Sequence, residues 1–209
     1  MSAPTHFIVA LQSVLLILAL SCCKSGDTDI QAPPVLSVTP ISLVGPYNPT
    51  TKSFGDVTFR GDRAMIPFGA PLTSTTLNAC FEYYTTTSAL VRASCSGEIV
   101  LMFKNEGIDD WEIHIKRAPE SYWDVQQGDQ VHAGDVLGGT GKWNQAQGIG
   151  RTELGVSYSE GPQYQSKGYC PLNYGTAEFV QGHNDLLAAM NAHGFGPFAS
   201  LCLAEMVNP

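Results

Sequence analysis

Residues 125–138 read VQQGDQVHAGDVLG and contain the dipeptide Gly-Asp twice, beginning at Gly128 and at Gly134. Each pair is followed by an apolar residue within two positions. Glycine readily adopts the positive φ of a tight turn, and aspartate hydrogen-bonds to its own backbone there. The stretch therefore predicts two successive tight turns, with the apolar residues that follow them entering a small β core.

Short alternating runs lie on both sides of this doubled turn. Residues 111–116 (WEIHIK) place Trp111 and two isoleucines on one face of a strand and Glu112 and His114 on the other. Many short strands at close spacing indicate an antiparallel barrel or sandwich. The predicted strands are 56–60, 64–68, 80–84, 89–92, 98–103, 111–116, 136–137 and 152–158.

The C-terminal part of the chain has a different pattern. Residues 177–193 place apolar side chains near helical spacing, and Gly194 follows as a stop signal. A second short helix is predicted at 197–206, because proline is favoured in a first helical turn. We therefore expect a β domain at 55–160 followed by a small helical cap at 161–209.

The N-terminus predicts export. Residues 7–20 form an apolar run that is short for a membrane span but typical of a secretory signal, here 1–22. Small residues before Cys22 and Cys23 resemble a bacterial lipoprotein signal, in which either cysteine could carry the lipid. Residues 1–23 contain no Lys or Arg, so an uncleaved N-terminal anchor is the alternative. The expected location is the bacterial cell envelope, outside the cytoplasm and anchored to a membrane.

Residues 23–54 hold five prolines together with many Ser and Thr, which is typical of an extended, semi-rigid linker. The whole chain has 11 Lys and Arg against 19 Asp and Glu, a net charge of −8. It therefore lacks the basic surface that nucleic acid requires, and we expect no nucleic-acid partner.

Four cysteines follow the export signal: Cys80, Cys95, Cys170 and Cys202. An even number in an oxidising compartment indicates two disulfides, and three pairings are possible. Local pairing, Cys80–Cys95 and Cys170–Cys202, is favoured because each bond closes a modest loop. Metal binding by these thiols is disfavoured, since no two are spaced Cys-x-x-Cys.

The order of motifs resembles the lysostaphin-type zinc endopeptidases of bacterial cell walls. The resemblance covers roughly residues 64–158 and implies a mainly β, barrel-sandwich hybrid fold: a lysostaphin-like antiparallel β domain, here with the C-terminal helical cap. Besides the doubled Gly-Asp turn, the matching segments are Pro67-Phe68-Gly69, 78–82 (NACFE), 97–100 (GEIV), 112–115 (EIHI), Gly139-Thr140-Gly141 and 150–154 (GRTEL).

The resemblance also implies where a metal site would lie. In that family the zinc ligands are the His and Asp of H-x-G-x-D and the last His of H-x-H. The corresponding positions here are Asn78, Glu82 and Glu153, while Arg151 occupies the position of the catalytic histidine. His114 matches the histidine of the family's Y-x-H-L strand and is the remaining candidate catalytic residue.

These replacements predict a disabled site. An amide and two carboxylates form an oxygen-only ligand set that would bind zinc weakly. Arg151 would oppose a divalent cation and can instead form ion pairs with Glu82 and Glu153. We therefore expect no metal and no cofactor.

Three hypotheses for function follow. The favoured one is a lipid-anchored, non-catalytic lysostaphin-like protein that binds peptidoglycan or regulates an envelope protein. The second is an atypical metal-dependent peptidoglycan endopeptidase that uses zinc with His114, Glu82 and Glu153. The third is a purely structural adaptor.

Overall fold

Antiparallel strands dominate the computed structural model, which describes residues 34–59, 63–105, 111–116, 128–160, 165–196 and 198–208. The predicted signal and both lipidation candidates, Cys22 and Cys23, lie outside these residues. The strands are β1 (Ser53–Phe54), β2 (Val57–Thr58), β3 (Met65–Ile66), β4 (Cys80–Thr86), β5 (Leu90–Arg92), β6 (Gly97–Lys104), β7 (Trp111–Lys116), β8 (Gln130–Val131), β9 (Val136–Gly139), β10 (Gly141–Asn144), β11 (Ile149–Glu160), β12 (Gln165–Tyr169) and β13 (Met206–Val207). The one α-helix in the described part is α1 (Ala177–Ala192), and 3₁₀ turns are η1 (Gln145–Gln147) and η2 (Pro171–Tyr174).

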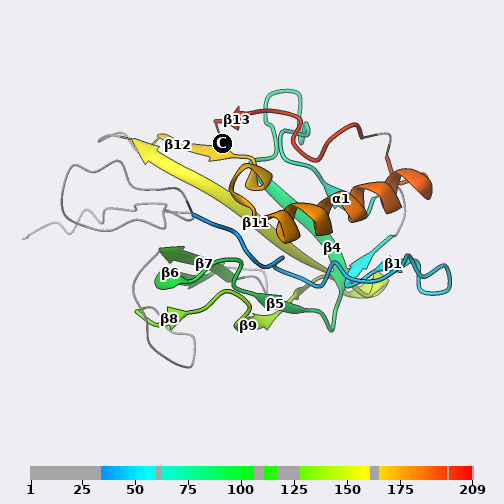
Figure 1. Cartoon of the computed structure of the whole chain (residues 1–209), viewed down its shortest axis with the longest axis horizontal. Coiled ribbons are helices and arrows are strands. Elements are labelled where there is room, and N and C mark those ends of the chain that lie inside the picture. Colours follow the sequence, from blue (N-terminus) through cyan, green and yellow to red (C-terminus); the bar gives the residue numbers. More distant parts are fainter. Residues whose placement is uncertain are drawn as a thin grey trace, which may run out of the picture.

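The strands form three sheets in the described part of the chain (Figure 1). The largest has the order β1-β2-β4-β11-β12-β13, with β3 beside β4 and β10 beside β11. The other two are β5-β9 and β7-β6-β8, and none of the three closes into a barrel among the described residues. Every strand that the sequence predicted is present, so the mainly β prediction is confirmed.

The pairing of β4 with β11 is central to the large sheet. Leu154 lies opposite Phe81 and Thr152 opposite Tyr83, and these side chains share one buried face. Alternate residues point to the other face, where Glu153 lies opposite Glu82. Helix α1 crosses the buried face, as Figure 1 shows.

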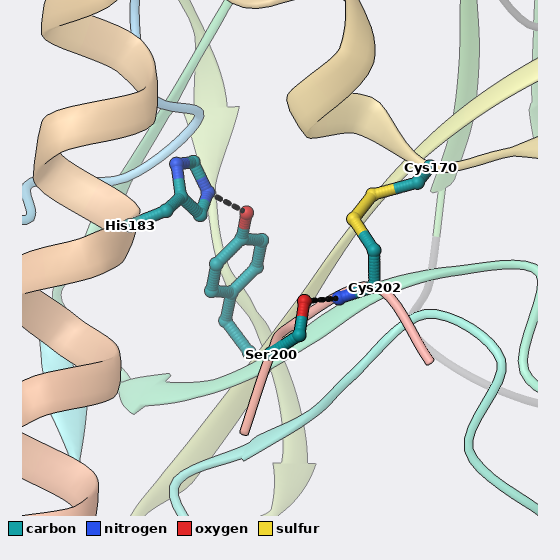
Figure 2. Close-up of a disulfide and its surroundings, with 5 residues drawn as sticks. Cys170, His183, Ser200 and Cys202 are labelled. Atoms are coloured by element: carbon teal, nitrogen blue, oxygen red, sulfur yellow. Dashed lines mark hydrogen bonds between the residues drawn. A yellow bond between two sulfur atoms is a disulfide. The ribbon is translucent and has the colours of Figure 1, made fainter. Parts of the chain in front are cut away.

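His183 joins α1 to that face (Figure 2). Its Nδ1–H donates to the Phe179 carbonyl at 2.8 Å, and the Tyr83 hydroxyl donates to its Nε2 at 2.7 Å. Burial lowers the pKa of His183 to about 4, because the charged ring would lose its hydration. The ring is therefore neutral, with its proton on Nδ1.

The prediction of a linker at 23–54 is wrong for its described part, residues 34–54. Leu36 and Ile41 are 0% exposed and Leu43 is 4% exposed, and all three belong to the main hydrophobic core. The many prolines suggested a solvated tether, but apolar residues between them supply enough buried surface to hold the segment against the fold.

Backbone hydrogen bonds tie this segment to elements on both sides. The Thr176 N–H donates to the Leu36 carbonyl at 2.8 Å, just before α1 begins. The Arg92 N–H donates to the Pro40 carbonyl, also at 2.8 Å, at the end of β5. The segment thus lies between the helix and a small sheet. A single hydrophobic core includes residues from 34–54, the β domain and the predicted cap, so the predicted boundaries do not separate independent cores.

The helical cap is confirmed in part. Helix α1 matches the predicted 177–193 and begins at Thr176, whose hydroxyl accepts from the Phe179 N–H at 3.3 Å. The second helix predicted at 197–206 is wrong for the described residues there. Its backbone pairs with the β3–β4 connection instead: the Leu203 N–H donates to the Phe68 carbonyl at 2.9 Å.

The doubled turn forms two matching backbone clamps. Gly128 and Gly134 have φ values of 99° and 97°, as the sequence predicted. Gly128 N–H donates to Ile99 O at 2.7 Å, and Ile99 N–H donates to the carbonyl of the following aspartate at 2.8 Å. Gly134 makes the same pair of bonds with Ala93, at 2.8 and 2.9 Å. We call these the Gly-Asp clamps.

One of the two predicted disulfides is formed. Cys170 and Cys202 are bonded, with Cα atoms 5.8 Å apart, and Ser200 Oγ accepts from the Cys202 N–H at 3.0 Å (Figure 2). Cys80 and Cys95 are not joined to each other. Cys80 lies at the start of β4, with its thiol toward β11. Cys95 lies in the connection between β5 and β6, which belong to the two smaller sheets. No helix in the described part is long and apolar enough to cross a membrane.

Replacing Cys170 and Cys202 together by Ser should lower the free energy of unfolding by about 3–4 kcal/mol, because the bond closes a loop of sequence separation 32. Urea denaturation of the full chain measures the change. Cys80→Ser is the control and should have a small effect. An equal loss of stability in the double variant and in Cys80→Ser would contradict a stabilising disulfide between Cys170 and Cys202.

Stability should also depend on pH through His183. Its pKa is lowered in the fold from 6.5 to about 4, so the unfolded chain binds the extra proton first as the pH falls. The free energy of unfolding should therefore fall by about 1.4 kcal/mol per pH unit between these values and then level off. Denaturation of wild type and His183→Gln across this range isolates the effect. An unchanged slope in the variant would show that other groups cause it.

Candidate functional site

The face of β4 and β11 opposite α1 gathers most of the site positions that the sequence predicted. Asn78, Cys80, Glu82, Arg151 and Glu153 form what we call the β4–β11 polar cluster. Side chains two apart on a strand share a face, and the register places Glu82 directly opposite Glu153. The long-range pairing of β4 with β11 therefore brings together residues that lie some seventy positions apart in the sequence.

Arg151 bridges the two carboxylates. Its Nη2 lies 3.2 Å from Glu153 Oε1 and its Nη1 lies 3.7 Å from Glu82 Oε1. The Glu82 side chain is only 9% exposed, so it depends on this guanidinium more than the half-exposed Glu153 does. Burial raises the pKa of Glu82, and the guanidinium opposes that rise. Within the cluster, the positive charge that balances the two carboxylates is thus the guanidinium of Arg151.

Cys80 lies at the middle position of 78–82, where the H-x-G-x-D pattern has glycine. Its Sγ lies 3.2 Å from Asn78 Oδ1 and 3.6 Å from Glu153 Oε2, so its single S–H has both oxygens as acceptors, with Asn78 the nearer. Burial, and then the nearby carboxylates, raise the pKa of Cys80 far above its usual range. The thiol therefore stays protonated, which makes it a poor nucleophile and a poor metal ligand.

Asn78 is used by the fold. It is 2% exposed, and its Nδ2 donates to the carbonyls of Ile66 and Pro67, both at 3.2 Å. Its Oδ1 accepts from the Cys80 thiol. The side-chain amide therefore anchors the end of β3, and its oxygen is already occupied.

His114 lies elsewhere. It is on β7, in the β7-β6-β8 sheet, and its Nε2 is 2.5 Å from Glu112 Oε1. The alternation of the strand predicted that Glu112 and His114 lie on the same face, and their contact agrees with this. That face was expected to be polar, yet His114 is buried, at 4% exposed. Within the described residues, no group of three or more His, Cys, Asp or Glu could hold a metal ion.

Two further residues complete the cluster, and neither was predicted as a site residue. The Tyr84 hydroxyl hydrogen-bonds to both Glu82 and Arg63, and burial raises the pKa of Tyr84. Strand alternation from Cys80 through Glu82 could have indicated Tyr84, which is the next residue on the same face. Arg63 follows no local pattern, because its place depends on how β3 pairs with β4.

Comparison with known proteins gives no match: no protein-family model, no curated protein and no solved structure matches this chain. The chemistry of the β4–β11 polar cluster limits what it can do. Arg151 already neutralises both carboxylates, the Cys80 thiol is protonated, and the Asn78 amide already has hydrogen-bond partners for its nitrogen and its oxygen. This arrangement favours rigidity over metal binding or nucleophilic catalysis.

Replacing Arg151 by Met should lower the free energy of unfolding by about 1–3 kcal/mol at pH 8, since Glu82 is left buried without its cation. The loss should be smaller at pH 5. Without the guanidinium the pKa of Glu82 rises further, so the folded state holds a proton that the unfolded state releases as pH increases.

Urea denaturation at the two pH values measures both effects. Adding Glu82→Gln to Arg151→Met should recover most of the stability at pH 8, because the uncompensated carboxylate is gone. A double variant that is as unstable as Arg151→Met alone would show that the guanidinium acts by packing and not by charge.

Proposed function

We propose that this chain is an exported, lipid-anchored, non-catalytic lysostaphin-like protein that binds cell-wall peptidoglycan. The proposal includes a barrel-sandwich hybrid fold for residues 55–160. Two features support that fold: the Gly-Asp clamps, and the pairing that sets Glu82 opposite Glu153, the positions of two family zinc ligands. Support for export comes from the apolar run at 7–20 and the cysteines that follow it.

The observation that carries the non-catalytic assignment is the Arg151 bridge between Glu82 and Glu153. A catalytic zinc site needs about three protein ligands and an open position for water. Here a guanidinium lies between the two carboxylates, and Cys80 adds bulk where the family pattern has glycine. Loss of catalysis leaves the surface around the cluster free to bind a wall polymer without cutting it.

The assignment predicts that the full chain, dialysed against zinc, retains far less than one zinc ion per molecule. A variant with Asn78→His, Glu82→Asp, Arg151→His and Glu153→His restores the family's residues and should retain about one. Metal analysis by mass spectrometry, with circular dichroism as a check on folding, measures both. Stoichiometric zinc in the wild type that is lost in Glu153→Ala would overturn the proposal in favour of an atypical endopeptidase.

Wall binding is tested by co-sedimentation of the full chain, in mild detergent, with purified peptidoglycan sacculi. The chain should sediment with the sacculi equally well with and without a zinc chelator, and the sacculi should release no soluble fragments. Absence of sedimentation would reject wall binding and leave regulation of an envelope protein as the remaining form of the hypothesis.

A further inference from the structure

A groove lies between helix α1 and the segment before β2, on a different part of the fold from the β4–β11 polar cluster. Its volume is about 640 Å³, and it is shallow and widely open to solvent. One wall comes from the chain around β1 and the other from the first half of α1. The residues that matter for its chemistry are Leu43, Val44, Phe54, Glu178, Gln181 and Asp185.

The first wall is apolar. Leu43 and Phe54 are 4% and 6% exposed and form its base, since both belong to the main core. Val44 is 77% exposed at the edge of the groove. A large apolar side chain at that exposure leaves surface whose burial by a partner would be favourable.

The second wall is acidic. Glu178, Gln181 and Asp185 are three and four positions apart in α1, so they share one face of the helix. Gln181 Nε2 donates to Asp185 Oδ1 at 2.7 Å, which fixes the direction of that carboxylate. Among the described residues that line the groove, none is Lys, Arg or His.

We propose that this α1 groove binds a short segment of another protein that presents an apolar side chain next to lysine or arginine. The apolar side chain covers Val44 and the base of the groove, and the cation lies against Glu178 and Asp185. Charge complementarity selects this partner, because an acidic segment would meet two carboxylates and no cation. The inference goes beyond the proposed wall binding, since it uses a different surface and none of the polar cluster.

The groove is held on a rigid support. Helix α1 is capped by Thr176, and the disulfide between Cys170 and Cys202 joins the chain before the helix to the chain after it. At Gly182 the helix lies against the segment before β1, where a Cβ would be in ordinary van der Waals contact with Thr39 Cγ2 at 3.6 Å and Leu43 Cβ at 3.7 Å. Little ordering is therefore needed on binding, which favours recognition of a short segment.

Three fluorescent peptides test the proposal against the full chain by anisotropy at low salt. The first carries the core KLVKLK, the second ELVELE with reversed charge, and the third KSGKSK without apolar residues. The first should bind at least tenfold more tightly than the other two, and its affinity should fall as salt is added. No binding of the first peptide, or equal binding of all three, would reject the proposal.

Variants of the chain locate the binding. Glu178→Gln and Asp185→Asn should each weaken binding of the first peptide by about two- to fivefold, as expected for exposed ion pairs. Val44→Ser should weaken it as well. Glu205→Gln removes an exposed carboxylate outside the groove and should change nothing. An equal loss in Glu205→Gln would show that the peptide responds only to the net charge of the protein, which would reject the α1 groove as its site. Neither result would bear on the proposed wall binding.

Discussion

The antiparallel pairing of β4 with β11 is the constraint on which the rest of the structure depends. Its register fixes two chemically different surfaces at once, because neighbouring residues on a strand point to opposite sides. On one side Phe81 and Tyr83 form the base on which α1 packs. On the other, Glu82 meets Glu153. A shift of one residue would bury the carboxylates under the helix and expose the aromatic rings, so the register is strongly specified.

The same two strands hold polar groups in two different ways. Toward α1, Tyr83 meets a neutral His183 through a hydrogen bond, in a space from which charge is excluded. Away from α1, Glu82 meets Arg151 as an ion pair that solvent partly reaches. The deeper side therefore depends on matched neutral donors and acceptors, and the shallower side tolerates opposite charges because their desolvation costs less.

Local patterns were enough to predict eight of the strands, helix α1 and the two Gly-Asp turns, since alternation, helical spacing and turn glycines act over a few residues. The meeting of Arg151 with Glu82 and Glu153 was an expectation from the resemblance to a known family, not from local patterns. Local patterns failed where distant contacts decide. Residues 34–54 read as a linker because their buried partners are remote in sequence, and Cys80 read as half of a disulfide because strand pairing, not loop length, decides where its thiol points. Arg63 gave no local signal at all.

The bond between Cys170 and Cys202 encloses η2, α1 and the irregular chain after the helix in one covalent ring. A protease that cuts one peptide bond within this ring opens it without releasing a fragment. The exposed residues that follow α1 are the accessible place for such a cut. A chain nicked there keeps its C-terminal piece, which carries Cys202 and β13, joined to the end of β12 for as long as the bond stays oxidised, and a reductant frees that piece from its covalent link. The ring therefore makes the integrity of this end of the molecule a matter of redox state as much as of an unbroken backbone.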